Sequence, residues 1–231
     1  MPISPIEFLS SVFIKLGKMH SRKGLYPFLT REFAMIPNGS QVLNVGAGGA
    51  IEEILSEYSA SRKFEVISLD IDPQRNPDIV ADLHEWNTER KFDVVVLAEV
   101  LEHCHTPHAA IGTIRKVLKP EGKLILTTPF MFPIHDAPYD YYRYTYYGLA
   151  RLLSDFENVK ITARNSWTEC VLVLLVRLVM DKSRFVRLVS PFFIVFAFVF
   201  WPIAWVLSRI VQTNFITTGY CVKATAKGES C

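Results

Sequence analysis

The feature that most constrains this chain is the stretch 42–50, in which a short apolar run stops at the glycines Gly46, Gly48 and Gly49. An amphipathic segment, 51–58, follows the glycines. This order predicts a buried strand, a tight turn and a helix. Glycines let the backbone approach a ligand closely, and the N–H groups at a helix start attract electron-rich atoms. The turn is therefore a candidate nucleotide site.

The spacing of the glycines decides between nucleotides. The dinucleotide fingerprint G-x-G-x-x-G needs a third glycine where Ile51 stands, which argues against NAD or FAD. The next predicted strand, 64–69, ends in Asp70, and Asp72 follows two residues later. Nucleotide-binding folds place an acid there to accept hydrogen bonds from ribose hydroxyls. A nucleotide-binding oxidoreductase is thus disfavoured.

Size and composition limit the alternatives. With 231 residues, half of them hydrophobic, the chain can bury the core of one α/β domain and have apolar sequence left over. A net charge of +2 without a basic stripe interleaved with aromatic residues gives no support for a nucleic-acid partner. The four cysteines have neither metal nor disulfide spacing, which indicates a reducing, cytosolic setting.

Strand and helix patterns alternate along the rest of the chain. The pattern predicts a weak strand at 79–81, a central strand at 92–98, a helix that includes 118–123 and a strand at 124–129. Such alternation favours a parallel sheet with helices on both faces. Further strands are predicted at 159–163 and 218–225.

Three segments between positions 40 and 130 together resemble the class I S-adenosylmethionine-dependent methyltransferases. They are the G-x-G-x-A turn at 46–50, the acid Asp70 at a strand end, and E-V-L-E-H at 99–103 followed by L-K-P-E-G at 118–122. The resemblance implies a Rossmann-like, seven-stranded, mostly parallel sheet whose last strand is antiparallel and lies between the fifth and sixth. It also implies S-adenosyl-L-methionine as the cofactor.

The resemblance further implies a set of cofactor-binding residues. An acid at the position of Asp82 would contact the adenine amino group, although a solvated loop acid or a helix cap is the alternative. His103 would line the mouth of the cofactor site. The expected set is Asn44, Gly46, Ala47, Gly48, Asp70, Ile71, Asp82, Leu83, Glu99 and His103.

The run 103–108 contains three histidines and Cys104, residue types that bind zinc. Side chains of sequence neighbours point apart, and no second cysteine pair exists to complete a tetrahedral site. We therefore expect no metal there. His105 and His108 are expected in a loop or at a helix start, with Pro107 setting the helix entry.

The segment 129–145 is the candidate acceptor site, because open α/β sheets bind ligands at the carboxyl ends of their strands. His135 suits proton removal from a hydroxyl or amine, and Asp140 would orient it. Arg143 would pair with a carboxylate or phosphate, and the tyrosines would stack on a ring. Alternatively, Asp140, Arg143 and Tyr144 brace a helix at 145–153. The H-x-x-P-x-D-Y-Y-R-Y-T pattern resembles methyltransferases encoded with bacterial cell-surface polysaccharide genes, which suggests a sugar or lipid-linked acceptor.

An apolar stretch lies between the last two predicted strands. No charged side chain occurs from 188 to 208, and both flanking strands must lie on one side of any membrane. The segment 171–180 is too short to span, whereas 188–211 is long enough but contains Pro191 and Pro202. We expect a re-entrant hairpin or in-plane anchor within 170–211; a buried helical subdomain or a dimer interface is the alternative. The cations expected to keep its ends cytoplasmic are Arg177, Lys182, Arg184, Arg187 and Arg209.

We expect no cleavable signal in the amino-terminal region, because prolines and an acid interrupt it. A capping box at 4–7 predicts an amphipathic helix, and a second helix is expected at 26–36. The predicted organisation is a helical cover at 1–38, a methyltransferase domain at 39–168 and 216–227, and an apolar insertion at 169–215. The predicted function is methyl transfer to an oxygen or nitrogen of a small-molecule, sugar or lipid-linked acceptor at the cytoplasmic face of a membrane. A non-catalytic, membrane-associated scaffold with the same fold is the alternative.

Overall fold

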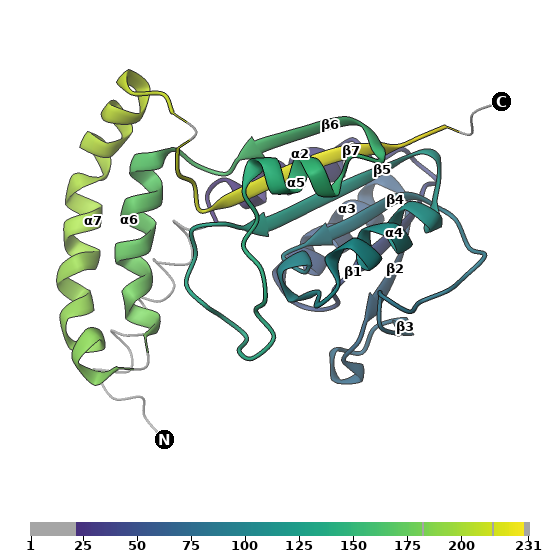
Figure 1. Cartoon of the computed structure of the whole chain (residues 1–231), viewed down its shortest axis with the longest axis horizontal. Coiled ribbons are helices and arrows are strands. Elements are labelled where there is room, and N and C mark those ends of the chain that lie inside the picture. The colour runs from purple at the N-terminus through teal and green to yellow at the C-terminus, as the bar shows by residue number, and fades with distance from the viewer. Residues whose placement is uncertain (1–21, 182, 214, 229–231) are drawn as a thin grey trace. The chain divides into compact units, whose positions relative to one another are not determined.

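The computed structural model describes residues 22–181, 183–213 and 215–228 (Figure 1). The amphipathic helix predicted near the amino terminus lies outside the described residues. The chain divides into two compact units. Among the described residues, the sheet unit comprises Pro27–Phe130, Ile134–Thr162 and 220–228, and the helical unit comprises 22–26, Met131–Pro133 and 163–219.

Seven strands form one sheet in the order β3-β2-β1-β4-β5-β7-β6. Strands β1 to β5 pair in parallel, whereas β7 lies between β5 and β6 and runs in the opposite direction (Figure 1). The predicted fold class and the place of the last strand are therefore confirmed. The strands are β1 (Gln41–Val45), β2 (Glu65–Asp70), β3 (Ile79–Val80), β4 (Phe92–Ala98), β5 (Leu118–Pro129), β6 (Phe156–Ala163) and β7 (Gly219–Ala226).

Helices cover both faces of the sheet, as its apolar strands require. Leu43 and Val95 belong to a core cluster that includes Ile114 and Leu149 from the helices on one face. Because side chains alternate along a strand, the equally buried Val42 points to the opposite face. Helices α4 (Pro107–Val117) and α5 (Tyr146–Leu152) lie on one side, and α2 (Leu25–Ala34) and α3 (Gly49–Arg62) on the other (Figure 1).

The prediction that residues 118–123 belong to a helix is wrong. Helix α4 ends at Val117, and the following residues begin β5. Pro120 disfavours a helical backbone before it, and Glu121 has a left-handed backbone with φ 61°. Phe92 pairs with Leu118, but Val94 pairs with Lys123, so the extra residues form an irregular bulge in the strand rather than a last helical turn.

The helical unit contains α6 (Trp167–Arg177), the short 3-10 helix η3 (Leu178–Met180) and α7 (Arg184–Ile210). Ser166 and Glu169 form a capping box at the start of α6. Val176 of α6 packs in one apolar cluster with Ile194 and Ala197 of α7. The unit is thus held together by apolar packing between two helices.

Helix α7 is apolar on more than the side that packs in this cluster. Within it, Leu188–Ile210 is long and apolar enough to cross a membrane by length and composition, and only 22% of its most apolar window is buried. Both Pro191 and Pro202 lie inside the helix. Its exposed apolar side chains include Phe185, Leu188, Phe192, Val195, Val199, Ile203 and Ile210.

Candidate functional site

The glycine turn joins the end of β1 to the start of α3. Gly46 and Gly48 have φ angles of 91° and 83°, a backbone region that favours glycine. A Cβ atom on Gly46 would lie 2.6 Å from Cγ2 of Val100, so no larger residue fits without movement. The Asn44 side chain donates a hydrogen bond to the carbonyl oxygen of Gly46 at 3.2 Å. Asn44 therefore braces the turn.

Asp70 ends β2 and is bound to this turn. Its Oδ2 accepts a hydrogen bond from the backbone N–H of Ala47 at 2.7 Å, and its Oδ1 accepts one from the backbone N–H of Asp72 at 2.9 Å. Arg75 donates to the carbonyl oxygen of Ala47 at 3.1 Å, and its Nε lies 3.8 Å from the carboxylate. Arg75 is not among the residues predicted from the sequence, although a basic residue shortly after the strand-end acid was an available signal.

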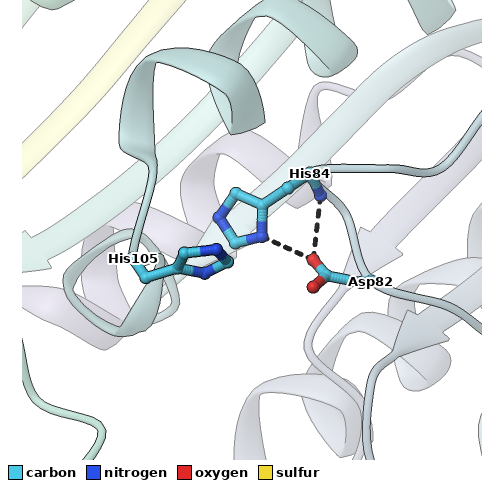
Figure 2. A group of neighbouring side chains, drawn as sticks. All are labelled: Asp82, His84 and His105. Carbon is cyan, nitrogen blue, oxygen red and sulfur yellow. Dashed lines mark hydrogen bonds and ion pairs between the residues drawn. The ribbon is translucent and has the colours of Figure 1, made fainter.

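Asp82 follows β3 and is paired locally with His84. Its Oδ1 accepts a hydrogen bond from the backbone N–H of His84 at 3.0 Å and also contacts the Nδ1 of that side chain (Figure 2). Burial opposes the charged carboxylate, but these bonds and the nearby imidazoles of His84 and His105 hold the pKa of Asp82 below its ordinary value. The neighbouring Leu83 belongs to the core, whereas Ile71 is exposed.

The end of β4 presents two acids. Glu99 has a left-handed backbone and accepts a hydrogen bond from the Thr127 hydroxyl at 3.0 Å. Glu102 is fully buried and accepts one from the Thr128 hydroxyl at 3.3 Å. The sequence predicts Glu99 at the site, whereas the place of Glu102 emerges only from the structure.

His135 lies between two carboxylates of the sheet unit. Its Nδ1 is 3.3 Å from Asp140 Oδ2, and its Nε2 is 3.8 Å from Glu102 Oε1. Its ring centroid is 5.0 Å from that of His103, whose Nδ1 contacts the carbonyl oxygen of Tyr139 at 2.9 Å. The expected pairing of Asp140 with His135 is therefore present in the geometry.

Arg143 extends both guanidinium branches to the Asp140 carboxylate. Burial opposes the charged form of Asp140, but the bonds from Arg143 and from the backbone N–H of His135 hold the pKa of its carboxyl below the ordinary value. The hydrogen bond to Asp140 likewise raises the pKa of Arg143. These contacts agree with the bracing interpretation of Arg143 rather than with a cation held ready for substrate.

The tyrosine-rich loop is anchored on the turn after β4. The backbone N–H groups of Tyr141 and Tyr142 both donate to the carbonyl oxygen of Glu102, at 2.9 and 3.2 Å. The Tyr144 hydroxyl donates to the carbonyl oxygen of Leu101 at 3.3 Å. Thr145 then caps α5 by accepting from the backbone N–H of Gly148. These contacts hold His135 and Asp140 close to Glu102.

The run 103–108 separates into different environments, as expected for neighbours in sequence. Cys104 is buried, and burial with the charges of Glu102 and Asp82 raises the pKa of its thiol to about 12. Pro107 is the first residue of α4, as predicted. Two groups of side chains have ligand atoms within 4.8 Å of one another, namely Glu102 with His103 and His135, and Asp82 with His84 and His105.

The seven-stranded sheet, with its glycine turn next to a strand-end acid, defines a Rossmann-like fold. Residues 19–160, more than half of the chain, match the family described as methyltransferase domain. The chain belongs to this family, as the sequence motifs predicted.

Curated relatives are similar over a shorter stretch. The ubiquinone biosynthesis O-methyltransferase of Idiomarina loihiensis is 34% identical over 108 residues, which cover 39% of this chain and 42% of that protein. The enzyme of the same name from Xanthomonas axonopodis is 34% identical over 110 residues, covering 40% and 44%. The chain thus spans less than half the length of these relatives.

Solved structures support the fold. A putative sarcosine dimethylglycine methyltransferase from Galdieria sulphuraria aligns with a TM-score of 0.59 at 14% identity, covering 87% of this chain and 84% of that one. The phosphoethanolamine N-methyltransferase 2 of Haemonchus contortus, in complex with S-adenosyl-L-methionine, aligns with a TM-score of 0.54 at 15% identity over 87% and 51%.

Asp140→Asn is expected to change the acid stability of the protein. Because folding lowers the pKa of Asp140, its stabilising contribution is fully present above the unfolded carboxyl value of about 3.9 and is lost as pH falls through the lower folded value. The variant should therefore be less stable than the parent at pH 6, with the difference shrinking below about pH 4. Urea unfolding followed by circular dichroism measures this.

The exposed Asp155→Asn is the matched control and should leave the pH profile unchanged. A stability difference for Asp140→Asn that stays constant from pH 6 to the acid limit would contradict the assigned pairing with Arg143.

Proposed function

We propose that this chain transfers a methyl group from S-adenosyl-L-methionine to an oxygen or nitrogen of a small-molecule, sugar or lipid-linked acceptor. The observation that supports this most is the hydrogen bond from the backbone N–H of Ala47 to Asp70. It joins the glycine turn to a buried acid, and both lie at the ends of adjacent parallel strands. A chain of the methyltransferase family that has both the glycine turn and this acid has the parts that cofactor binding needs.

The residues present fit the cofactor. A Cβ atom placed on Gly48 or Gly49 would meet no other atom within 4 Å, so the turn leaves room for a ligand beside its backbone. The exposed Ile71 side chain offers an apolar surface next to Asp70 for the nucleoside. Leu83 points into the core, so its backbone is the part available to a ligand. The bound sulfonium supplies an already activated methyl group.

Beyond binding, the chain must align the acceptor and remove its proton. His135 is the proposed base, with its Nδ1 facing Asp140 and its Nε2 facing Glu102. A proton taken from a hydroxyl or amine would leave an imidazolium between two carboxylates, which stabilise that charge. Arg143 is then a positioning residue, because it holds Asp140 rather than the acceptor.

The surroundings of His135 favour an acceptor with a flat or apolar part. Ile134, Tyr139 and Tyr141 of the same loop are exposed. The two tyrosine side chains can stack on a ring, and all three side chains can pack against a lipid tail. The similar proteins from Idiomarina and Xanthomonas are named for O-methylation in ubiquinone biosynthesis, which makes a quinone-like lipid a further candidate beside sugars and lipid-linked sugars.

We further propose that helix α7 attaches the protein to the cytoplasmic face of a membrane. Its exposed apolar residues would be unfavourable in water, and Arg184 and Arg209 lie at its two ends. Helix α6 has 11 residues, about 17 Å, and is too short to span, so an in-plane or re-entrant arrangement fits better than a spanning pair. Arg177 is buried with its guanidinium 4.6 Å from the Phe132 ring, so it does not act as an interfacial cation.

The rival proposal is a membrane-associated scaffold that binds the cofactor without turnover. The presence of the glycine turn, Asp70 and the His135–Asp140 pair favours an enzyme over this rival. The two differ in one measurable property, because only the enzyme releases S-adenosylhomocysteine when given an acceptor.

S-adenosylmethionine and S-adenosylhomocysteine are expected to bind the purified full chain, whereas NADH is not. Asp70→Ala should weaken binding by at least about tenfold, since it removes a charged hydrogen-bond acceptor. Titration calorimetry measures both affinities. Asp72→Ala is the matched control, because that side chain caps the following 3-10 helix, η1 (Pro73–Arg75), and should leave the affinity near that of the parent. A folded protein that binds neither sulfur nucleotide would overturn the proposal.

His135→Ala is expected to lower kcat by about a hundredfold or more for a neutral hydroxyl acceptor, with little effect on cofactor affinity. For an acceptor that is already anionic the loss should be much smaller, because no proton needs to be removed. Release of S-adenosylhomocysteine with catechol and lipid-linked sugar acceptors gives the rates. His108→Ala, an exposed histidine of α4, is the control. Equal rates for His135→Ala and the parent would exclude a base at this position.

Replacing Val195 and Val199 together with aspartate should reduce binding to vesicles that contain anionic lipid by at least about fivefold, because both side chains are exposed on α7. Flotation of the full chain with vesicles measures the bound fraction. Val80→Asp, at an exposed valine of the sheet unit, is the control and should not change it. A parent protein that stays monodisperse without detergent and does not float would contradict membrane attachment.

A further inference from the structure

Asp82, His84 and His105 form a cluster on the sheet unit. The proposed methyl transfer gives no role to His84 or His105. Asp82 and His84 come from the loop after β3, and His105 comes from the loop that precedes α4 (Figure 2). Figure 2 shows the His84 ring between the other two side chains. One ligand atom from each residue lies within 4.8 Å of the others.

The hydrogen bonds of His84 leave one ring nitrogen available. Its Nδ1 faces Asp82 Oδ1, and its backbone N–H donates to the same oxygen. The Nε2 atom is buried and has no hydrogen-bond partner among the residues that the structure describes. A buried polar atom without a partner costs free energy, so a ligand that accepts this lone pair would stabilise the arrangement.

His105 supplies a second imidazole beside this nitrogen. The two ring centroids are 4.2 Å apart with the planes inclined at 60°. The position of His105 is supported by Tyr142, whose hydroxyl donates to its backbone carbonyl oxygen at 3.2 Å. Because His105 is exposed while His84 is nearly buried, an ion in solution has a path to the cluster.

The chemistry of these groups selects a class of ion. Two imidazole nitrogens, with water, suit Zn²⁺ and similar first-row divalent ions, whereas Mg²⁺ and Ca²⁺ prefer oxygen ligands. A carboxylate that contacts one nitrogen of a histidine fixes its tautomer and raises the basicity of the other nitrogen, a common arrangement around bound zinc.

We propose that His84 and His105 bind a divalent ion of the zinc class, with Asp82 orienting the His84 ring and water completing the coordination. The ion joins the loop after β3 to the loop before α4 and so fixes the edge of the sheet at which Asp82 stands. The site shares Asp82 with the cofactor-binding set expected from the sequence, so zinc binding is measured in the absence of nucleotide.

Zinc binding to the full chain tests the site directly. The protein is stripped of metal with a chelator, dialysed and titrated with Zn²⁺ by calorimetry in the absence of nucleotide; Co²⁺ absorption spectra report the ligand type. One equivalent should bind, and His105→Ala should weaken binding by at least about tenfold. Mg²⁺ should not compete.

Two further variants locate the ion. His108→Ala removes an exposed histidine that lies outside the cluster and should leave the affinity unchanged. His84→Gln should lose binding as His105→Ala does; if it fails to fold, the exposed His105 decides alone. The absence of zinc binding, or binding that survives His105→Ala, would overturn the proposal. So would binding that is lost only in His135→Ala, because the ion would then belong to the group of Glu102, His103 and His135.

Discussion

The bond between Asp70 and the backbone of Ala47 is the interaction on which the arrangement of the site depends. The turn after β1 has a left-handed backbone at its glycines, which leaves N–H groups that need acceptors. The backbone N–H of Gly46 donates to Leu69 at 2.8 Å, and that of Ala47 donates to the Asp70 carboxylate at 2.7 Å. The Asp70 carboxylate also accepts a hydrogen bond from the backbone N–H of Asp72, and the Arg75 Nε lies 3.8 Å from it. Strand pairing and the Asp70 carboxylate thus set the conformation of the glycine turn before any ligand binds.

Glu102 organises the other side of the site. It is fully buried, and both His103 and His135 point a nitrogen toward its Oε1, at 3.9 and 3.8 Å. Its backbone carbonyl also receives the tyrosine-rich loop. Because Cys104 faces the core, His103 and His105 on either side of it join different clusters. A single short turn therefore connects the proposed base with the proposed metal site.

The family match covers most of the sheet unit but not the two long helices of the helical unit. The match ends at residue 160, before α6 and α7 begin, so the family relation gives no information about these helices. The apolar α7 packs against α6 by small and aliphatic side chains such as Ala197 and leaves large ones such as Phe192 exposed.

The sequence by itself determined where most strands, the glycine turn and the strand-end acids lie along the chain, because these depend on local pattern and on residues close together in the chain. It also determined the family. The place of the last strand within the sheet followed from the family resemblance. Only the tertiary structure decided that Leu118–Gly122 belongs to a strand and that Arg143 pairs with Asp140. It also decided that Glu102, Arg75 and His84 contact residues of the proposed site. The strand at Leu118–Gly122 follows from pairing with β4. The side-chain contacts arise between loops and leave no periodic signal in the sequence. Such contacts arise when strand ends distant in sequence meet at one edge of a parallel sheet.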